Sequence, residues 1–192
     1  MPNWCDNSIT ISHPDPTMME RAVKAWNEHK FLQEFIPCPE ELTETMAGFC
    51  GQGTYAQELL EFKQNLNLKF FGFKNWYDFN NAKWGCKWDI GGDADLDNQL
   101  DPNESKAQFS SHFDSPWCPP IAGYHELVKL GFSIHAYYYE SGMGFCGRFT
   151  TEDGDDYYEI TGDSDWVKKN IPDDIDNEFC ISESMADWES DQ

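Results

Sequence analysis

The segment from residue 93 to residue 104 combines residue types and spacing suited to calcium binding. Its acidic side chains fall at positions 1, 3, 5, 9 and 12 of the segment, and they are Asp93, Asp95, Asp97, Asp101 and Glu104. Loops of the EF-hand type place oxygen ligands at these positions. Asn98 stands where glycine is expected, and Pro102 interrupts the second half. The alternative is a solvated acidic β-hairpin. Apart from this candidate calcium ion, no cofactor is expected.

A second candidate site combines tryptophans with a few polar side chains. Aromatic walls with convergent polar groups are typical of small-molecule pockets. The residues of this candidate pocket are Asn3, Trp4, Asn81, Trp84, Lys87, Trp88, Trp117 and Glu140. The alternative is a structural role, in which the indoles fill the core and their N–H groups find hydrogen-bond partners.

Patterns typical of enzymes are weak. Gly142–Gly147 matches G-x-G-x-x-G, but the following Arg148–Thr151 has the pattern of a strand, whereas a dinucleotide site needs a helix there. The glycines therefore favour a hairpin or a tight bend near a buried aromatic residue. Cys118 could pair with His112 or His125, yet reactive thiolates need electropositive surroundings, in which this chain is poor. The sequence predicts a protein that is not an enzyme.

Charge gives the broadest constraint on function. The chain has 13 Lys and Arg against 35 Asp and Glu, a net charge of -22 over 192 residues, and it is 16% aromatic. The aromatic content favours a folded body over a disordered acidic chain. Such a surface repels nucleic acid and anionic membranes and attracts basic proteins. The absence of a secretory signal and of paired cysteine motifs predicts a cytoplasmic protein with reduced thiols and no membrane partner.

The acidic residues concentrate after residue 150. That segment carries a net charge of -13, with Lys168 and Lys169 as its bases. Together with the residues of the calcium candidate, the predicted partner-binding surface contains Asp153, Asp155, Asp156, Asp163, Asp165, Asp173, Asp174 and Asp176. Large apolar residues in the same segment, such as Trp166 and Phe179, indicate that it packs on its own domain or on a partner.

The elements that must position these residues follow from hydrophobic periodicity. Strands are predicted at 8–12, 89–98, 106–113, 132–140, 142–151 and 157–161, and helices at 17–30, 55–66, 121–130 and 164–170. The helix at 55–66 is expected to bury Leu59, Leu60, Phe62 and Leu66. This order predicts an α+β domain over 1–150, with an antiparallel sheet, helices on one face and an insert around 40–90. An acidic extension, 151–192, follows it.

Four segments together resemble a known family. They are Met1–Asn7, Asn81–Asp89, Phe113–Pro120 and Tyr139–Gly147, with the unusual strings Trp-Gly-x-Lys-Trp-Asp and Trp-x-Pro-Pro. In this order they resemble the YubB-type ferredoxin-like domain family, which is found on phages, plasmids and genomic islands. The resemblance implies a ferredoxin-like fold without an iron–sulfur cluster and a mobile-element origin. It implies no established activity and no catalytic residues.

Charge and resemblance together predict a non-enzymatic phage or mobile-element protein of the bacterial host cytoplasm. Its acidic surface would mimic nucleic acid and inhibit a host protein with a basic nucleic-acid-binding surface, as in counter-defence against CRISPR or restriction systems. Direct nucleic-acid binding is not expected, because such affinity comes from Lys and Arg that displace counterions. The alternative function is binding of a small molecule or nucleotide signal in the tryptophan-lined pocket.

Overall fold

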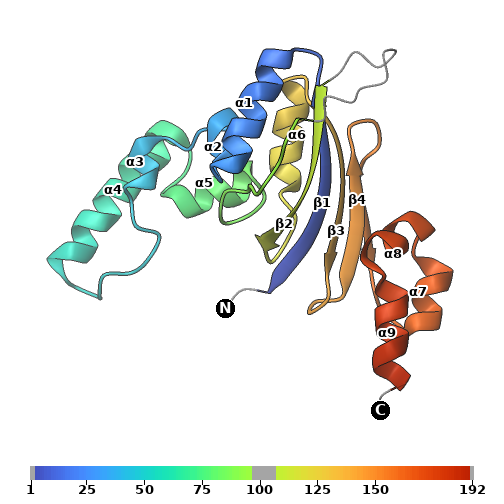
Figure 1. Ribbon diagram of the computed structural model, residues 1–192. Coiled ribbons are helices and arrows are strands. Elements are labelled where there is room, and N and C mark those ends of the chain that lie inside the picture. The colour runs from blue at the N-terminus through green and yellow to red at the C-terminus, as the bar shows by residue number, and fades with distance from the viewer. Residues whose placement is uncertain (1–2, 97–106, 191–192) are drawn as a thin grey trace.

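A five-stranded antiparallel sheet forms the centre of the molecule. The computed structural model describes residues 3–96 and 107–190. Its strands lie in the order β2-β1-β3-β4-β5 (Figure 1). Their bounds are β1 Trp4–His13, β2 Ala107–Pro116, β3 Ser133–Glu140, β4 Phe145–Thr150 and β5 Gly154–Glu159. The predicted α+β class and antiparallel sheet are therefore confirmed.

Strand β1 lies inside the sheet, between β2 and β3, and its alternating side chains give it a buried face. Ile9 and Ile11 are buried, and Ile11 lies opposite Phe109 of β2 and Ile134 of β3. Strands β2 and β3 flank β1 and are joined through helix α6, Ile121–Lys129. The main hydrophobic core thus lies between one face of the sheet and the helices above it.

Helices α1, Pro16–Asn27, and α2, Phe31–Phe35, cover this first face together with α6 (Figure 1). Trp26 of α1 is fully buried against Phe31, Phe109 and Phe113. Its indole N–H donates to Ser111 Oγ at 3.1 Å, so this buried donor has a hydrogen-bond partner. A tryptophan at the centre of the core explains part of the high aromatic content.

Three helices cover part of the opposite face, which corrects the expectation of helices on one face only. They are α7 Ser164–Asn170, α8 Asp173–Phe179 and α9 Ile181–Ser190. They form a second core with Tyr137, Tyr139 and Cys146. Because β3 and β4 carry apolar residues on both faces, both faces need cover. Residues 151–190 also supply β5, so the acidic segment begins inside the sheet.

The predicted insert forms a helical lobe beside the main core. It contains α3 Glu40–Thr43, α4 Tyr55–Phe71 and α5 Trp76–Lys83, and α4 stands farthest from the sheet (Figure 1). The helix predicted at 55–66 is confirmed as part of α4, but the prediction of which residues it buries is wrong. Leu60 is buried, whereas Leu59, Phe62 and Leu66 are 46%, 61% and 40% exposed.

Amide side chains line most of the packed face of α4. Asn67 is buried and donates to Thr45 Oγ1 at 2.9 Å and to the Lys74 carbonyl at 3.1 Å. Gln57 Oε1 accepts from the Cys50 N–H at 2.8 Å. These hydrogen bonds tie α4 to the irregular segments around it, and they turn its apolar face outwards.

The strand predicted at 89–98 is wrong for the described residues 89–96, which form an irregular strap across α1. The Asn27 side chain holds the strap at Ala94, accepting from its N–H at 2.8 Å and donating to its carbonyl at 3.0 Å. At Gly91 an added Cβ would lie 2.3 Å from the Trp26 carbonyl oxygen. The strap approaches α1 too closely for any other residue at that position.

Candidate functional site

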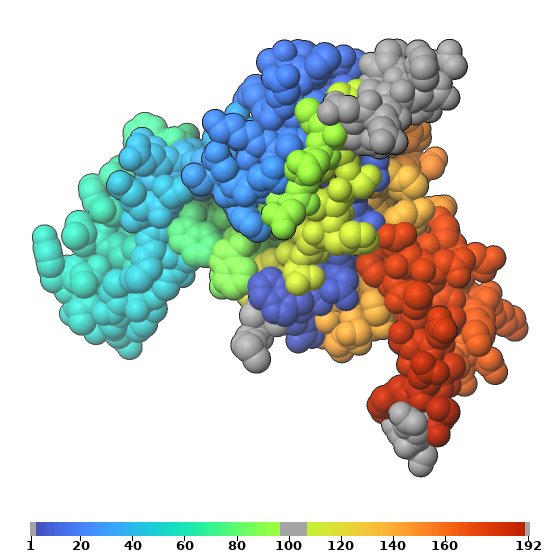
Figure 2. Space-filling model, viewed as in Figure 1, coloured from blue at the N-terminus to red at the C-terminus, as the bar shows by residue number. Residues whose placement is uncertain are grey.

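The acidic residues after position 150 gather on β5 and on α7, α8 and α9. These elements form one end of the molecule, far from the α4 lobe (Figures 1 and 2). The predicted surface residues Asp165 and Asp173 are exposed, as are Asp163 and Asp174, whereas Asp156 and Asp176 are half-buried. The fold therefore brings together most of the acidic residues that the sequence singled out. Some of them form hydrogen bonds within the molecule, and others do not.

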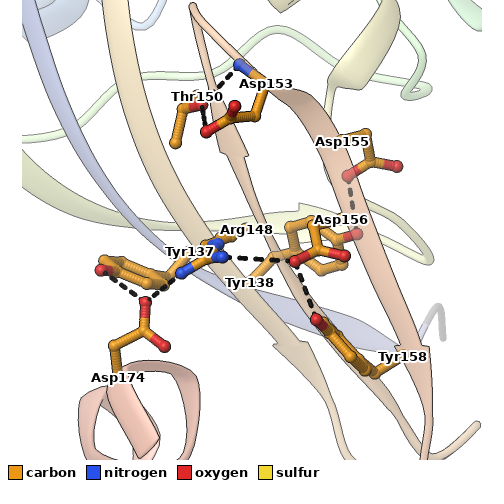
Figure 3. A network of polar contacts seen from close by, with 9 residues as sticks. All are labelled: Tyr137, Tyr138, Arg148, Thr150, Asp153, Asp155, Asp156, Tyr158 and Asp174. Atoms are coloured by element: carbon orange, nitrogen blue, oxygen red, sulfur yellow. Dashed lines mark hydrogen bonds and ion pairs between the residues drawn. The ribbon is translucent and has the colours of Figure 1, made fainter. Parts of the chain in front are cut away.

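A network centred on Arg148 of β4 fastens α8 to the sheet (Figure 3). Arg148 donates to Asp174 of α8 at 2.6 Å and to Asp156 of β5 at 3.4 Å. The hydroxyl of Tyr158 donates to Asp156 at 2.8 Å, and that of Tyr137 to Asp174 at 3.3 Å. Two predicted surface carboxylates thus act as internal braces.

The electrostatics of the network follow from this geometry. Partial burial works to raise the pKa of Asp174, but the hydrogen bond and charge of Arg148 outweigh it and hold that pKa below its usual value. The hydrogen bond to Asp174 also raises the pKa of Arg148. Asp174 is therefore ionised at neutral pH, and its charge is largely balanced within the molecule.

Other acidic residues brace the C-terminal helices. Asp163 accepts from the Trp166 N–H at 2.9 Å and caps α7. Asp176 accepts from the N–H and hydroxyl of Ser182 at 2.7 and 2.6 Å, which ties α8 to α9. Glu189 accepts from the N–H and hydroxyl of Ser164 at 2.9 and 2.7 Å and closes α9 onto α7. Charge-assisted bonds of this kind hold the three helices in fixed positions.

Two further predicted surface residues belong to the β4–β5 hairpin. Asp155 accepts from the Tyr138 hydroxyl at 2.8 Å (Figure 3). Burial raises the pKa of Asp155, although the Tyr138 hydrogen bond opposes the shift. The N–H of Asp153 donates to Thr150 Oγ1 at 2.9 Å across the turn. Both residues contribute to the hairpin.

A second set of carboxylates is free for an external partner. Within the described part of the chain, seven acidic residues of this end form no side-chain hydrogen bond or ion pair: Glu152, Glu159, Asp165, Asp173, Glu178, Glu183 and Asp187. Sequence reasoning placed only Asp165 and Asp173 among the surface residues. Glu183 and Asp187 lie four residues apart, a spacing that places both side chains on one face if the segment is helical, and this was the signal that could have identified the pair.

The calcium candidate is only partly described. Asp93 and Asp95 are exposed at the end of the strap, whereas Asp97, Asp101 and Glu104 lie outside the described residues. Among residues 3–96 and 107–190, no group of three or more His, Cys, Asp or Glu side chains is arranged to hold a metal ion. Calcium binding by the full loop stays a prediction.

Four residues of the candidate pocket do meet. Trp4 and Trp88 lie with ring centroids 5.9 Å apart, and the Lys87 ammonium lies 4.7 Å from the Trp88 ring and 5.3 Å from the Trp117 ring. Trp4, Trp88 and Trp117 are 47%, 41% and 43% exposed. They form a surface patch, here called the indole patch, in which Lys87 makes cation–π contacts.

The other candidate pocket residues have structural roles. Trp84 is buried and donates its indole N–H to the Ile36 carbonyl at 2.9 Å. Asn81 donates to the Tyr77 carbonyl within α5 at 2.7 Å. Glu140 is buried and accepts from the N–H groups of Gly142 and Met143, and an added Cβ at Gly142 would meet the Asn3 side chain. Glu140 and Asn3 thus shape the β3–β4 hairpin.

The glycine-rich motif forms a turn, and burial raises the pKa of two of the cysteines. The predicted hairpin is confirmed, because residues 142–144 form the turn between β3 and β4. Cys118 Sγ donates to the Gly85 carbonyl at 3.1 Å, and burial raises the pKa of this thiol. Burial likewise raises the pKa of Cys38 to about 11. These thiols are protonated at neutral pH, and a protonated thiol is a poor nucleophile.

Comparisons with known proteins give one structural neighbour. No family model matches the sequence, and no curated protein matches it. Among solved structures, the chain is similar to the protein api92 from Yersinia pseudotuberculosis, described as DUF1281. The TM-score is 0.41 at 11% identity, over 84% of this chain and 99% of that chain. The resemblance to the YubB-type family stays a prediction. No helix within the described residues is long and apolar enough to cross a membrane.

Proposed function

We propose that this protein is a non-enzymatic phage or mobile-element accessory protein, built on a ferredoxin-like core with an acidic C-terminal part, that binds and inhibits a host protein. Its partner would present a basic nucleic-acid-binding groove, as the nucleases of CRISPR and restriction systems do. The observation that carries the proposal is the set of free carboxylates on β5 and α7–α9, held beside carboxylates that brace the same helices.

Bracing matters because it lowers the cost of binding. A basic groove gains most from charges that are already in position, since ordering a flexible acidic segment would consume part of the interaction free energy. Arg148, Asp176 and Glu189 hold the helices that carry Glu178, Glu183 and Asp187. A surface of one sign also speeds association with a partner of the opposite sign.

The test is capture of partners from host lysate at low and high salt. We expect a nucleic-acid-binding protein that duplex DNA displaces and that elutes as screening increases. The variant Glu183→Gln with Asp187→Asn should weaken this capture. Its matched control, Glu20→Gln with Glu28→Gln, removes the same charge from two exposed positions, one within α1 and one at its C-cap. Partners without nucleic-acid affinity, or equal effects of the two variants, would contradict the proposal.

The indole patch supports a second candidate function, the binding of a small molecule or nucleotide signal. Its exposed rings offer stacking surfaces for a base, and Lys87 supplies a positive charge beside Trp88 and Trp117. Thermal shift against nucleotides tests it, because a ligand of the native state raises the melting temperature with its concentration. Lys87→Met should abolish such a shift, whereas a shift that persists in this variant would rule out the patch.

A further inference from the structure

The outward face of α4 carries a continuous apolar seam. Tyr55, Leu59, Phe62 and Leu66 follow one another at intervals of four, three and four residues, and all four are exposed. This is the spacing of a and d positions in a coiled coil, with Leu59 and Leu66 at a and Tyr55 and Phe62 at d. Contiguous exposed apolar side chains can mark an interaction site.

The charges beside the seam are arranged for a parallel partner helix. Glu58 takes a g position and Lys63 the following e position. Five residues apart, they do not face each other on one helix, where pairs form at intervals of three or four. Within the described residues neither forms an ion pair. In parallel coiled coils, g and e positions of opposite charge pair between helices.

We propose that α4 is a self-association surface, on which two copies of this chain pair in parallel about a twofold axis along the helices. Glu58 of each copy then faces Lys63 of the other, which gives two ion pairs across the seam. An antiparallel pair sets e against e and g against g. The e positions hold Ala56, Lys63 and Phe70, and the g positions hold Glu58 and Asn65, so no opposite charges would meet.

The distribution of charge allows two such acidic molecules to approach through α4. In this helix Glu58 and Glu61 are balanced by Lys63 and Lys69. The acidic C-terminal helices lie at the other end of the molecule (Figures 1 and 2). The amide face of α4 packs against the rest of the same chain. In the dimer, the bodies of the two copies would therefore lie on opposite sides of the seam.

Sedimentation velocity of the full chain over a range of micromolar concentrations tests the proposal. We expect a reversible monomer–dimer equilibrium, which Phe62→Ala with Leu66→Ala should weaken at least about tenfold. The matched control is Leu68→Ala, which lies on α4 outside the seam and is also exposed. Circular dichroism checks that each variant is folded. A chain that is monomeric throughout, or a dimer unaffected by the seam variant, would overturn the proposal.

Charge exchange tests the parallel arrangement. In the proposed dimer, position 58 of one copy faces position 63 of the other. Glu58→Lys alone places two positive charges there, and Lys63→Glu alone places two negative charges, so each variant should weaken the dimer. The double variant restores opposite charges and should recover the affinity, as should mixing the two single variants. A double variant that dimerises as weakly as the single ones would contradict parallel pairing. Because no residue of the acidic surface is altered, the outcome is independent of the proposed function.

Discussion

At the scale of single residues, the aspartate of the Trp-Gly-x-Lys-Trp-Asp string is a remote helix cap. Asp89 accepts from the N–H groups of Leu32, Gln33 and Ile90 at 2.7, 2.9 and 2.8 Å. Lys30, which precedes α2, makes no capping bond of its own. Burial raises the pKa of Asp89, and the three backbone hydrogen bonds oppose that shift. The string that carries the family resemblance therefore serves the fold at this position.

The substitution Asp89→Asn should destabilise the protein by about 2 kcal/mol, because an amide has one acceptor oxygen for three N–H donors. Urea denaturation measures the change in the free energy of unfolding. The control is Asp15→Asn at the cap of α1, which should change stability by less than about 0.5 kcal/mol because Asn and Asp cap helices equally well. Equal losses in the two variants would contradict the capping role.

At the scale of elements, Arg148 links α8 to strands β4 and β5 of the sheet. The variant Arg148→Met keeps the aliphatic stem but leaves Asp156 and Asp174 without their shared cation. Since the side chains involved are more than a third exposed, we expect a loss of about 1 kcal/mol. Hydrogen exchange should accelerate in α7–α9 and not in α1.

The matched control removes another surface ion pair. Arg21 donates to Glu34 at 2.6 Å between α1 and α2, and both side chains are similarly exposed. Arg21→Met should leave exchange in α7–α9 unchanged. If both variants loosen the C-terminal helices equally, the network of Figure 3 does not hold α8 in place.

The strap over α1 gives a second prediction at this scale. Gly91→Ala should destabilise the protein by about 2 kcal/mol, because the new methyl group meets the Trp26 carbonyl and the His29 backbone. Gly48→Ala is the control, since its Cβ would lie 3.7 Å from its nearest neighbour. Thermal melts compare the two, and similar melting temperatures would contradict the close approach of strap and helix.

Sequence patterns were enough to predict the strands and helices that depend mainly on their own residues. Alternation predicted the central part of β1, a strong strand run predicted β3, and the pattern of a short capped helix predicted α7 at its observed bounds. Partners distant in sequence decide the rest. The apolar stripe of α4 is real, but amides that bond the neighbouring segments determine which face is packed. In the candidate site, the acidic positions were predictable, whereas the bracing role of Asp174 depends on Arg148 from another element.

At the scale of the whole molecule, net charge opposes the compact state at neutral pH. The chain carries -22 and has a pI of about 4.3. Burial, and a facing carboxylate at Asp114, raise the pKa of Asp6 above the ordinary 3.8. Burial also raises the pKa of Asp89 and Asp155. Each of these groups takes up its proton more readily in the folded state than in the unfolded chain.

Acidification should therefore stabilise the protein. A group with a raised folded pKa adds stability as pH falls through that pKa towards its unfolded value. The opposite contribution of Asp174 is lost only below 3.8, since its pKa is lowered. The melting temperature should rise between pH 7 and about pH 5 at low salt, and salt should reduce the rise by screening. A fall over this range at low salt would contradict the prediction.

The edge of the sheet at β5 has a consequence for how copies of this chain meet. An open edge offers unpaired backbone groups to any other strand, and charged residues are a common protection against such pairing. β5 carries Asp155, Asp156 and Glu159 within six residues. Two such edges would bring rows of carboxylates together, which opposes sheet extension and the growth of fibrils from this end of the molecule. We therefore expect these acidic residues to disfavour aggregation through the β5 edge.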